Sequence, residues 1–122
     1  ADGYWSNVWL KKPFTFVKWG ARPTPDTMFT LAYAADAAWN ESHWKNDRFN
    51  ELLVMARSEI DEGKRTEMYR EMQVLAKDDG GTIIPFFLNY LDARRKNVHH
   101  GPSIASNWEN DGARAAQRWW FE

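Results

Sequence analysis

The strongest constraint on the fold is an amphipathic pattern in the middle of the chain. Between positions 49 and 60, apolar residues recur at helical spacing and form one stripe, which consists of Phe49, Leu52, Leu53, Ala56 and Ile60. Asn46 or Asp47 can cap the start of such a helix. Because a stripe of this width has to be buried, the pattern predicts a helix that packs on another element.

A second amphipathic helix is predicted directly after the first, from about Lys64 to Lys77. Its inner face carries Met68, Met72, Leu75 and Ala76. The break between the two periodic segments is Asp61-Glu62-Gly63. Two consecutive helices with so short a connection are expected to form an antiparallel pair.

Two strands are predicted on either side of this pair. Phe14 to Trp19 combines aromatic and β-branched residues, and we expect it to lie beneath the helices. Thr82 to Leu88 is continuously apolar and predicts a buried strand, in which Pro85 indicates an edge position or a bulge.

Three short helices complete the expected elements. One runs from Gly3 to Leu10, and another extends to about Tyr33 after a cap at Thr24 or Asp26. The third is predicted at 111–118, in the tryptophan-rich C-terminal region.

Charge and cysteine content exclude several classes of function. The formal net charge is −1 and the basic residues are scattered, whereas a protein that binds nucleic acid normally carries a basic stripe. The chain has no cysteine, so disulfides and thiolate metal sites are excluded. No apolar run approaches the length of a membrane span.

The aromatic content indicates a surface or cavity lined by rings. Eight tryptophans are present in 122 residues, and aromatic residues make up 16% of the chain. A core of this size cannot bury all of them and also give each indole N–H a partner. We therefore expect some of them to line a ligand cavity, or a surface that is covered in the complete molecule.

The loop after the first predicted strand is the leading candidate site, and it comprises Trp19, Gly20, Ala21 and Arg22. An arginine at the end of a strand can bind a carboxylate or phosphate through two parallel hydrogen bonds. Trp19 can stack on a flat or sugar-like ligand. The alternatives are core packing for Trp19, and for Arg22 a surface position or an ion pair with Asp26.

Trp39 and Asn40 form the second candidate site, because a tryptophan that can stack stands beside an amide that can orient a polar ligand group. The alternatives are core packing for Trp39 and turn closure for Asn40.

Catalysis and metal binding are not expected. His99 and His100 are adjacent, so their side chains diverge on an extended chain. Glu109 and Asp111 form a pair of acids, but no apolar surroundings raise the pKa of either one. We therefore expect no enzyme activity, no cofactor and no bound metal.

The order of several motifs resembles one family over nearly the whole chain. Tyr4-Trp5 precedes a strand, Lys18 to Thr24 follows it, and two amphipathic helices lead to Ile83-Ile84-Pro85-Phe86-Phe87. This order is similar to the C-terminal portion of a periplasmic solute-binding protein of the peptide/nickel type. Such receptors deliver peptides, opines, nickel chelates or sugars to ABC importers.

The resemblance implies a two-lobed α/β receptor with helices packed on a mixed sheet. Residues 1–89 would belong to the second lobe, and residues 90–122 would return to the first lobe. The expected partners are a small-molecule ligand, the ABC permease at the inner membrane and the remaining N-terminal portion of the same receptor. The expected location is the periplasm, with the signal peptide upstream, and the family needs no cofactor.

The chain departs from the family pattern at Arg22. Several peptide-binding relatives carry an aspartate near this position, where it holds a ligand amine. The arginine makes a peptide N-terminus a less expected ligand and favours an anionic one. The alternative function is a free-standing, tryptophan-rich carbohydrate-binding module, which would consist mostly of β structure.

Overall fold

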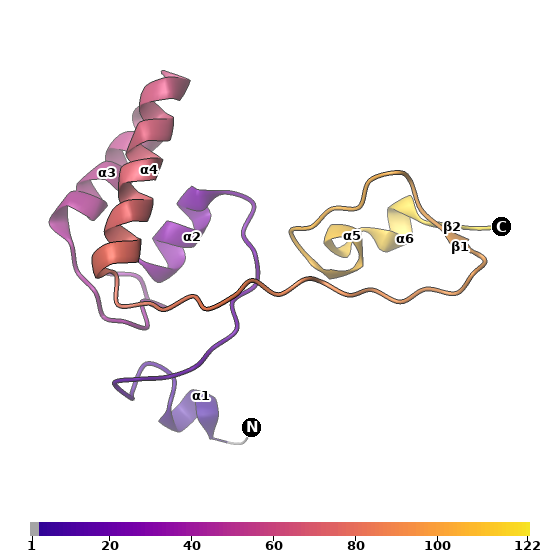
Figure 1. The fold of residues 1–122 in the computed structure, drawn as a ribbon, viewed down its shortest axis with the longest axis horizontal. Helices are drawn as coiled ribbons and strands as arrows, with labels where there is room; N and C mark the ends of the chain where they lie inside the picture. Colours follow the sequence, from indigo (N-terminus) through magenta and orange to yellow (C-terminus); the bar gives the residue numbers. More distant parts are fainter. Residues whose placement is uncertain (1–2) are drawn as a thin grey trace. The chain divides into compact units, whose positions relative to one another are not determined.

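A computed structural model describes residues 3–122, which divide into two compact units (Figure 1). The helical unit comprises residues 3–18 and 24–84, and the tail unit comprises residues 19–23 and 85–122. The helical unit contains α1 (Tyr4–Asn7), α2 (Pro25–Ala32), α3 (Asp47–Ser58) and α4 (Glu62–Asp79). The tail unit contains β1 (Val98–His99), α5 (Glu109–Ala113), α6 (Ala115–Arg118) and β2 (Trp120–Phe121).

The predicted helix pair is confirmed, with corrected ends. α3 and α4 pack against each other, as Figure 1 shows. Asn46 caps α3 by accepting a hydrogen bond from the Phe49 N–H at 2.9 Å. Asp61 caps α4 in the same way, so α4 begins at Glu62 rather than Lys64. α3 ends at Ser58, which leaves Ile60 outside the buried stripe with 92% of its surface exposed.

The core of the helical unit lies between α2, α3 and α4. Phe49 is fully buried at its centre, with its ring 5.2 Å from that of Phe29 and 5.0 Å from that of Trp44. These edge-to-face contacts add to the apolar burial. The other buried apolar side chains are Leu52, Leu53, Ala56 and Met72. The apolar stripe predicted for α3 therefore identifies most of the buried core residues correctly, with Ile60 as the exception.

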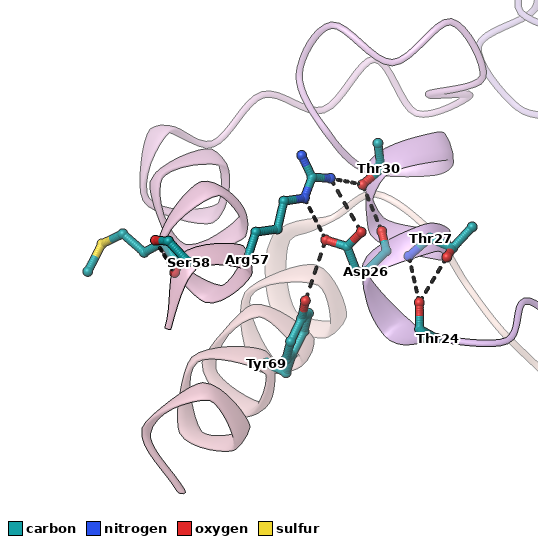
Figure 2. A network of polar contacts seen from close by, with 8 residues as sticks. Thr24, Asp26, Thr27, Thr30, Arg57, Ser58 and Tyr69 are labelled. Carbon is teal, nitrogen blue, oxygen red and sulfur yellow. Dashed lines mark hydrogen bonds and ion pairs between the residues drawn. The ribbon is translucent and has the colours of Figure 1, made fainter. Parts of the chain in front are cut away.

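α2 begins where the sequence predicts, and its first turn is tied to the helix pair. Thr24 is the cap and accepts from the Thr27 N–H at 3.3 Å. Asp26 accepts instead from the Nε of Arg57 on α3 and from the Tyr69 hydroxyl on α4 (Figure 2). Burial raises the pKa of Tyr69, and the adjacent Asp26 carboxylate raises it further.

The two predicted strands are wrong. Residues 14–19 and 82–88 form no strand and pair with no strand among the described residues. Phe14 and Phe16 are 83% and 74% exposed, so the helix pair does not rest on them. Composition favours an extended backbone, but a strand also needs a neighbour to satisfy its N–H and C=O groups, and residues 3–122 supply none here.

The N-terminal helix is shorter than predicted. α1 spans Tyr4–Asn7 instead of continuing to Leu10, which adopts a positive φ of 59°. A left-handed residue ends a right-handed helix because their backbone angles are incompatible.

The tail unit contains a small antiparallel sheet and a left-handed turn. β1 pairs with β2, with Val98 opposite Phe121 and His99 opposite Trp120. The helix predicted at 111–118 is confirmed only at its C-terminal end, as α6, because Asn110, Asp111, Gly112 and Ala113 all have positive φ values.

A buried carboxylate holds this left-handed turn. Asp111 is 1% exposed and accepts from the Ala105 N–H at 2.6 Å, the Arg118 Nη1 at 2.8 Å and the Trp119 Nε1 at 3.2 Å. Several hydrogen bonds to one carboxylate offset the cost of its burial and of the strained backbone.

The described residues thus form a small, helix-rich protein with one two-stranded sheet, which agrees with the α/β class at a coarse level. No described helix combines the length and the apolar character that crossing a bilayer demands. The chain passes from the helical unit to the tail unit between residues 84 and 85. The lobe boundary at residues 89 and 90 concerns a longer receptor and stays a prediction.

Candidate ligand-binding site

The candidate loop of residues 19–23 belongs to the tail unit, where Arg22 is held against its own loop. The Nη1 group of Arg22 donates to the Gly20 carbonyl at 3.0 Å and to the Ala21 carbonyl at 3.1 Å. Its guanidinium lies 5.6 Å from the centre of the Trp19 ring, within the range of a cation–π contact. The loop therefore fixes the arginine before any ligand arrives, which lowers the entropy cost of binding.

Two nitrogen atoms of the Arg22 guanidinium can still donate hydrogen bonds to a ligand. Its Nη1 atom is occupied by the loop carbonyls, whereas Nε and Nη2 donate to no residue in the range 3–122. These two atoms form the edge of a guanidinium that binds a carboxylate or phosphate bidentately. The side chain is half-buried, so the edge is partly shielded from water. The geometry suits an anionic group.

Tyr90 and Trp108 complete the site, and the sequence did not reveal either of them. The Ala21 N–H donates to the Tyr90 hydroxyl at 3.4 Å. A Cβ atom added at Gly20 would lie 3.2 Å from the Trp108 ring and 3.7 Å from the Tyr90 hydroxyl. Gly20 is therefore the point where the two rings approach the loop backbone. Only the folded chain brings residues so distant in sequence together.

Trp39 and Asn40 belong to the helical unit, whereas Arg22 belongs to the tail unit. Asn40 is 4% exposed, and its Nδ2 donates to the carbonyls of Ala34 at 3.2 Å and Trp44 at 2.7 Å. Its Oδ1 accepts from the Ser42 hydroxyl at 3.1 Å. These bonds give Asn40 the turn-closing role that the sequence left open as the alternative.

Trp39 belongs to a row of aromatic side chains in the helical unit. Tyr4, Trp5, Trp9 and Trp39 follow one another with ring centres 5.1, 5.4 and 6.4 Å apart. The Trp9 Nε1 donates to Glu41 at 2.5 Å. Trp5 and Trp39 remain 65% and 42% exposed. We call these four residues the aromatic row, and Trp5 and Trp39 are the members that present their rings to solvent.

The two adjacent histidines and Asp111 of the tail unit have local partners. The Nε2 of His99 lies 3.5 Å from the Glu122 carboxylate, and the His100 Nδ1 lies 2.6 Å from the Gly101 carbonyl oxygen. No cluster of His, Asp or Glu within residues 3–122 has the arrangement of a metal site. The Asp111 carboxylate is engaged with Ala105, Arg118 and Trp119, so its geometry is that of a structural residue.

An open groove of about 760 Å³ runs between α3 and α4, and Leu52, Met55, Met68 and Val74 contribute its apolar lining. Charged side chains form ion pairs at its edge, among them Arg48 with Glu71 at 2.8 Å. None of the predicted ligand-binding residues lines this groove.

The comparisons with known proteins return no relative for this arrangement. The chain matches no family model, no curated protein and no solved structure.

Proposed function

We propose that this chain is the C-terminal part of an extracytoplasmic solute-binding receptor of the peptide/nickel type, which captures a small polar ligand for an ABC importer. The ordered sequence motifs support this proposal. In the receptor, residues 1–89 belong to the second lobe and residues 90–122 return to the first lobe. The protein acts in the periplasm and binds its ligand without catalysis or a cofactor. The permease recognises the receptor in the conformation in which the two lobes have closed on the ligand.

The observation that carries the proposal is the loop at Trp19–Pro23. Arg22 is anchored through Nη1 and offers Nε and Nη2, while Tyr90 and Trp108 approach the same loop. A few polar donors beside aromatic walls are typical of small-molecule sites. The ligand is therefore expected to combine an anionic group with a flat or sugar-like portion, as an opine or a modified peptide does.

The first experiment identifies the ligand. The complete receptor is purified under mild conditions and examined by native mass spectrometry for a small molecule bound at one equivalent. An anionic compound that exchanges with added ligand supports the proposal. A receptor that carries nothing and takes up no compound from an anionic peptide, opine and sugar-phosphate set counts against it.

The second experiment tests Arg22 by calorimetry with the ligand so identified. Arg22→Ala should weaken binding by about 2–5 kcal/mol, and Arg22→Lys should recover only part, because an ammonium cannot form the fork. Arg114→Ala is the matched control, since this exposed arginine of the tail unit bonds only Gln117 through its side chain among the described residues. Binding of Arg22→Ala within threefold of wild type would contradict the anion site.

A carbohydrate-binding module is the second candidate, and the aromatic row favours it. Its exposed rings, Trp5 and Trp39, are of the kind that stack on sugars. Successive rings, however, lie at 87°, 78° and 65° to one another, so they form no flat platform for a sugar chain. Quenching of tryptophan fluorescence by soluble polysaccharides, lost in Trp5→Ala, would favour this candidate over the receptor.

A further inference from the structure

Trp108 contacts the loop of the candidate site, and its place depends on the turn that follows it. Its ring lies 3.2 Å from the point where a Cβ atom at Gly20 would stand, and 48% of the residue's surface is exposed. One part of the ring therefore contacts the loop, and the rest is open to a ligand. The Trp108 carbonyl accepts a hydrogen bond from the Gly112 N–H at 3.1 Å, which ties this residue to the left-handed turn at residues 110–113.

The left-handed turn needs support from outside. Asn110, Asp111 and Ala113 have φ values of 52°, 61° and 61°, a region that is unfavourable for residues with a Cβ atom. Gly112 adopts a φ of 69° without that cost, and a Cβ atom there would come within 2.9 Å of the Asn107 Oδ1. A strained backbone of this kind persists only where the surrounding structure holds it.

Hydrogen bonds to two carboxylates hold the turn. Asp111 accepts from residues before and after it. The Asp92 carboxylate accepts from the Asn110 N–H, with Oδ2 at 3.1 Å and Oδ1 at 3.3 Å. Asn110 is the first left-handed residue of the turn and lies two positions after Trp108. Asp92 therefore holds the turn at the end that carries Trp108.

The segment that carries Asp92 also holds the loop of the candidate site. Tyr90, two residues earlier, accepts with its hydroxyl from the Ala21 N–H at 3.4 Å. Residues 90–92 thus bond both to the loop at residues 19–23 and to the turn at residues 110–113, and all of them belong to the tail unit. Because three residues span at most about 10 Å, this segment limits how far the turn can lie from the loop.

We propose that Asp92 is a positioning residue of the candidate ligand-binding site: by accepting from the Asn110 N–H, it keeps the Trp108 ring beside Gly20. This inference rests on the proposed function, in which Arg22 binds the anionic group of the ligand and the aromatic residues contact its flat portion. The role of Asp92 is indirect. Its carboxylate determines where the ring stands, and so how tightly the flat portion is bound.

The first test follows the Trp108 ring in the chain labelled with fluorotryptophan. Asp92→Ala should move the ¹⁹F resonance of Trp108, assigned with Trp108→Phe, towards its position in the urea-unfolded chain, because the ring loses its support. Asp92→Asn should move it less, since an amide oxygen can still accept from the Asn110 N–H. Glu109→Ala is the matched control, because Glu109 is an exposed acid beside Trp108 whose side chain makes no hydrogen bond or ion pair with the described residues.

The resonances of Trp119 and Trp120, in the same unit, distinguish positioning from a general loss of structure. Both should stay in place in Asp92→Ala and in Asp92→Asn. A Trp108 resonance that stays in place in Asp92→Ala would overturn the proposal. So would one that moves only together with those of Trp119 and Trp120 in both variants, or one that moves as far in Glu109→Ala.

The second test measures dissociation constants for acetate and benzoate by NMR titration. Acetate offers Arg22 a carboxylate alone, whereas benzoate adds a flat ring for Trp108. Asp92→Ala should weaken the binding of benzoate roughly threefold to tenfold, the size of one lost ring contact, and that of acetate by less than about twofold. Arg22→Ala should weaken both to the same extent.

The outcomes separate the role of Asp92 from the proposed function. If Asp92→Ala weakens both compounds equally, or neither, Asp92 does not position the wall that contacts the flat portion. A wild-type chain that binds neither compound would count against the anion site itself, and the ¹⁹F resonance of Trp108 would then decide on Asp92 alone.

Discussion

Asp26 in the first turn of α2 accepts a 2.8 Å hydrogen bond from the Nε of Arg57 in the last turn of α3. Arg57 also donates to the Thr30 hydroxyl, and Tyr69 on α4 donates to the same carboxylate (Figure 2). The hydrogen bond to Asp26 raises the pKa of Arg57. A single carboxylate therefore connects the three helices of the core at their polar edge.

Asp26→Asn tests this connection. Both partners are partly exposed to solvent, so the expected loss of unfolding free energy is modest, about 0.5–1 kcal/mol. Urea denaturation followed by circular dichroism measures it. Asp36→Asn is the control, since Asp36 is exposed and makes no hydrogen bond or ion pair with the described residues, and it should leave the free energy unchanged.

Leu53→Ala tests the core of the helical unit. Leu53 is 4% exposed, and its truncation leaves a cavity that costs about 2–5 kcal/mol. Val54→Ala, one residue further on the same helix but 67% exposed, should change the unfolding free energy by less than about 0.5 kcal/mol. Equal losses in the two variants would show that the buried side of α3 is assigned incorrectly.

Asp111 gives the tail unit a dependence on pH. The hydrogen bond from the Ala105 N–H, assisted by Trp119 and the Arg118 charge, lowers the pKa of Asp111 below its usual 3.8. A carboxyl with a lowered folded pKa contributes its full stability above the unfolded value, and loses it as the pH falls through the lower, folded value. Thermal melts from pH 6 downward should therefore show destabilisation that begins near pH 3.8.

Asp111→Asn should remove this part of the acid dependence and destabilise the tail unit already at neutral pH, because an amide cannot accept all three hydrogen bonds. Melts of the variant that lose stability with acid as steeply as wild type would assign the effect to other carboxylates.

Gly20→Ala tests the approach of Trp108 to the candidate site. The added methyl would lie 3.2 Å from the Trp108 ring, so the ring has to shift by a few tenths of an ångström. In protein labelled with fluorotryptophan, the ¹⁹F resonance of Trp108, assigned with Trp108→Phe, should move. Gly101→Ala is the matched control in the tail unit, because nothing lies within 4 Å of its added Cβ, and it should leave that resonance in place.

The sequence predicts those structural elements whose interacting residues lie close together along the chain. The helix pair was predictable because the periodicity and the Asn46 cap are local signals, whereas the cap at Asp61 was interpreted as part of the break between the helices. The strands were not, since residues 14–19 and 82–88 have strand composition but no neighbour to pair with. The left-handed turn at residues 110–113 depends on the buried carboxylate of Asp111, which no local pattern reveals.

The same distinction holds for the candidate site. Gly20, Arg22 and Pro23 mark the loop locally, because they combine a flexible position, a charge and a rigid position. Tyr90 and Trp108 reach that loop only through the fold, and nothing in their own surroundings distinguishes them from the other aromatic residues.

The apolar segment at residues 82–91 also determines where the chain is most easily cut. A protease needs several residues of extended backbone free of hydrogen bonds, and residues 82–91 already have that form. Brief digestion with chymotrypsin, which cleaves after phenylalanine, tyrosine and leucine, should first nick the chain at residues 86–91. The helical part should survive as one stable fragment.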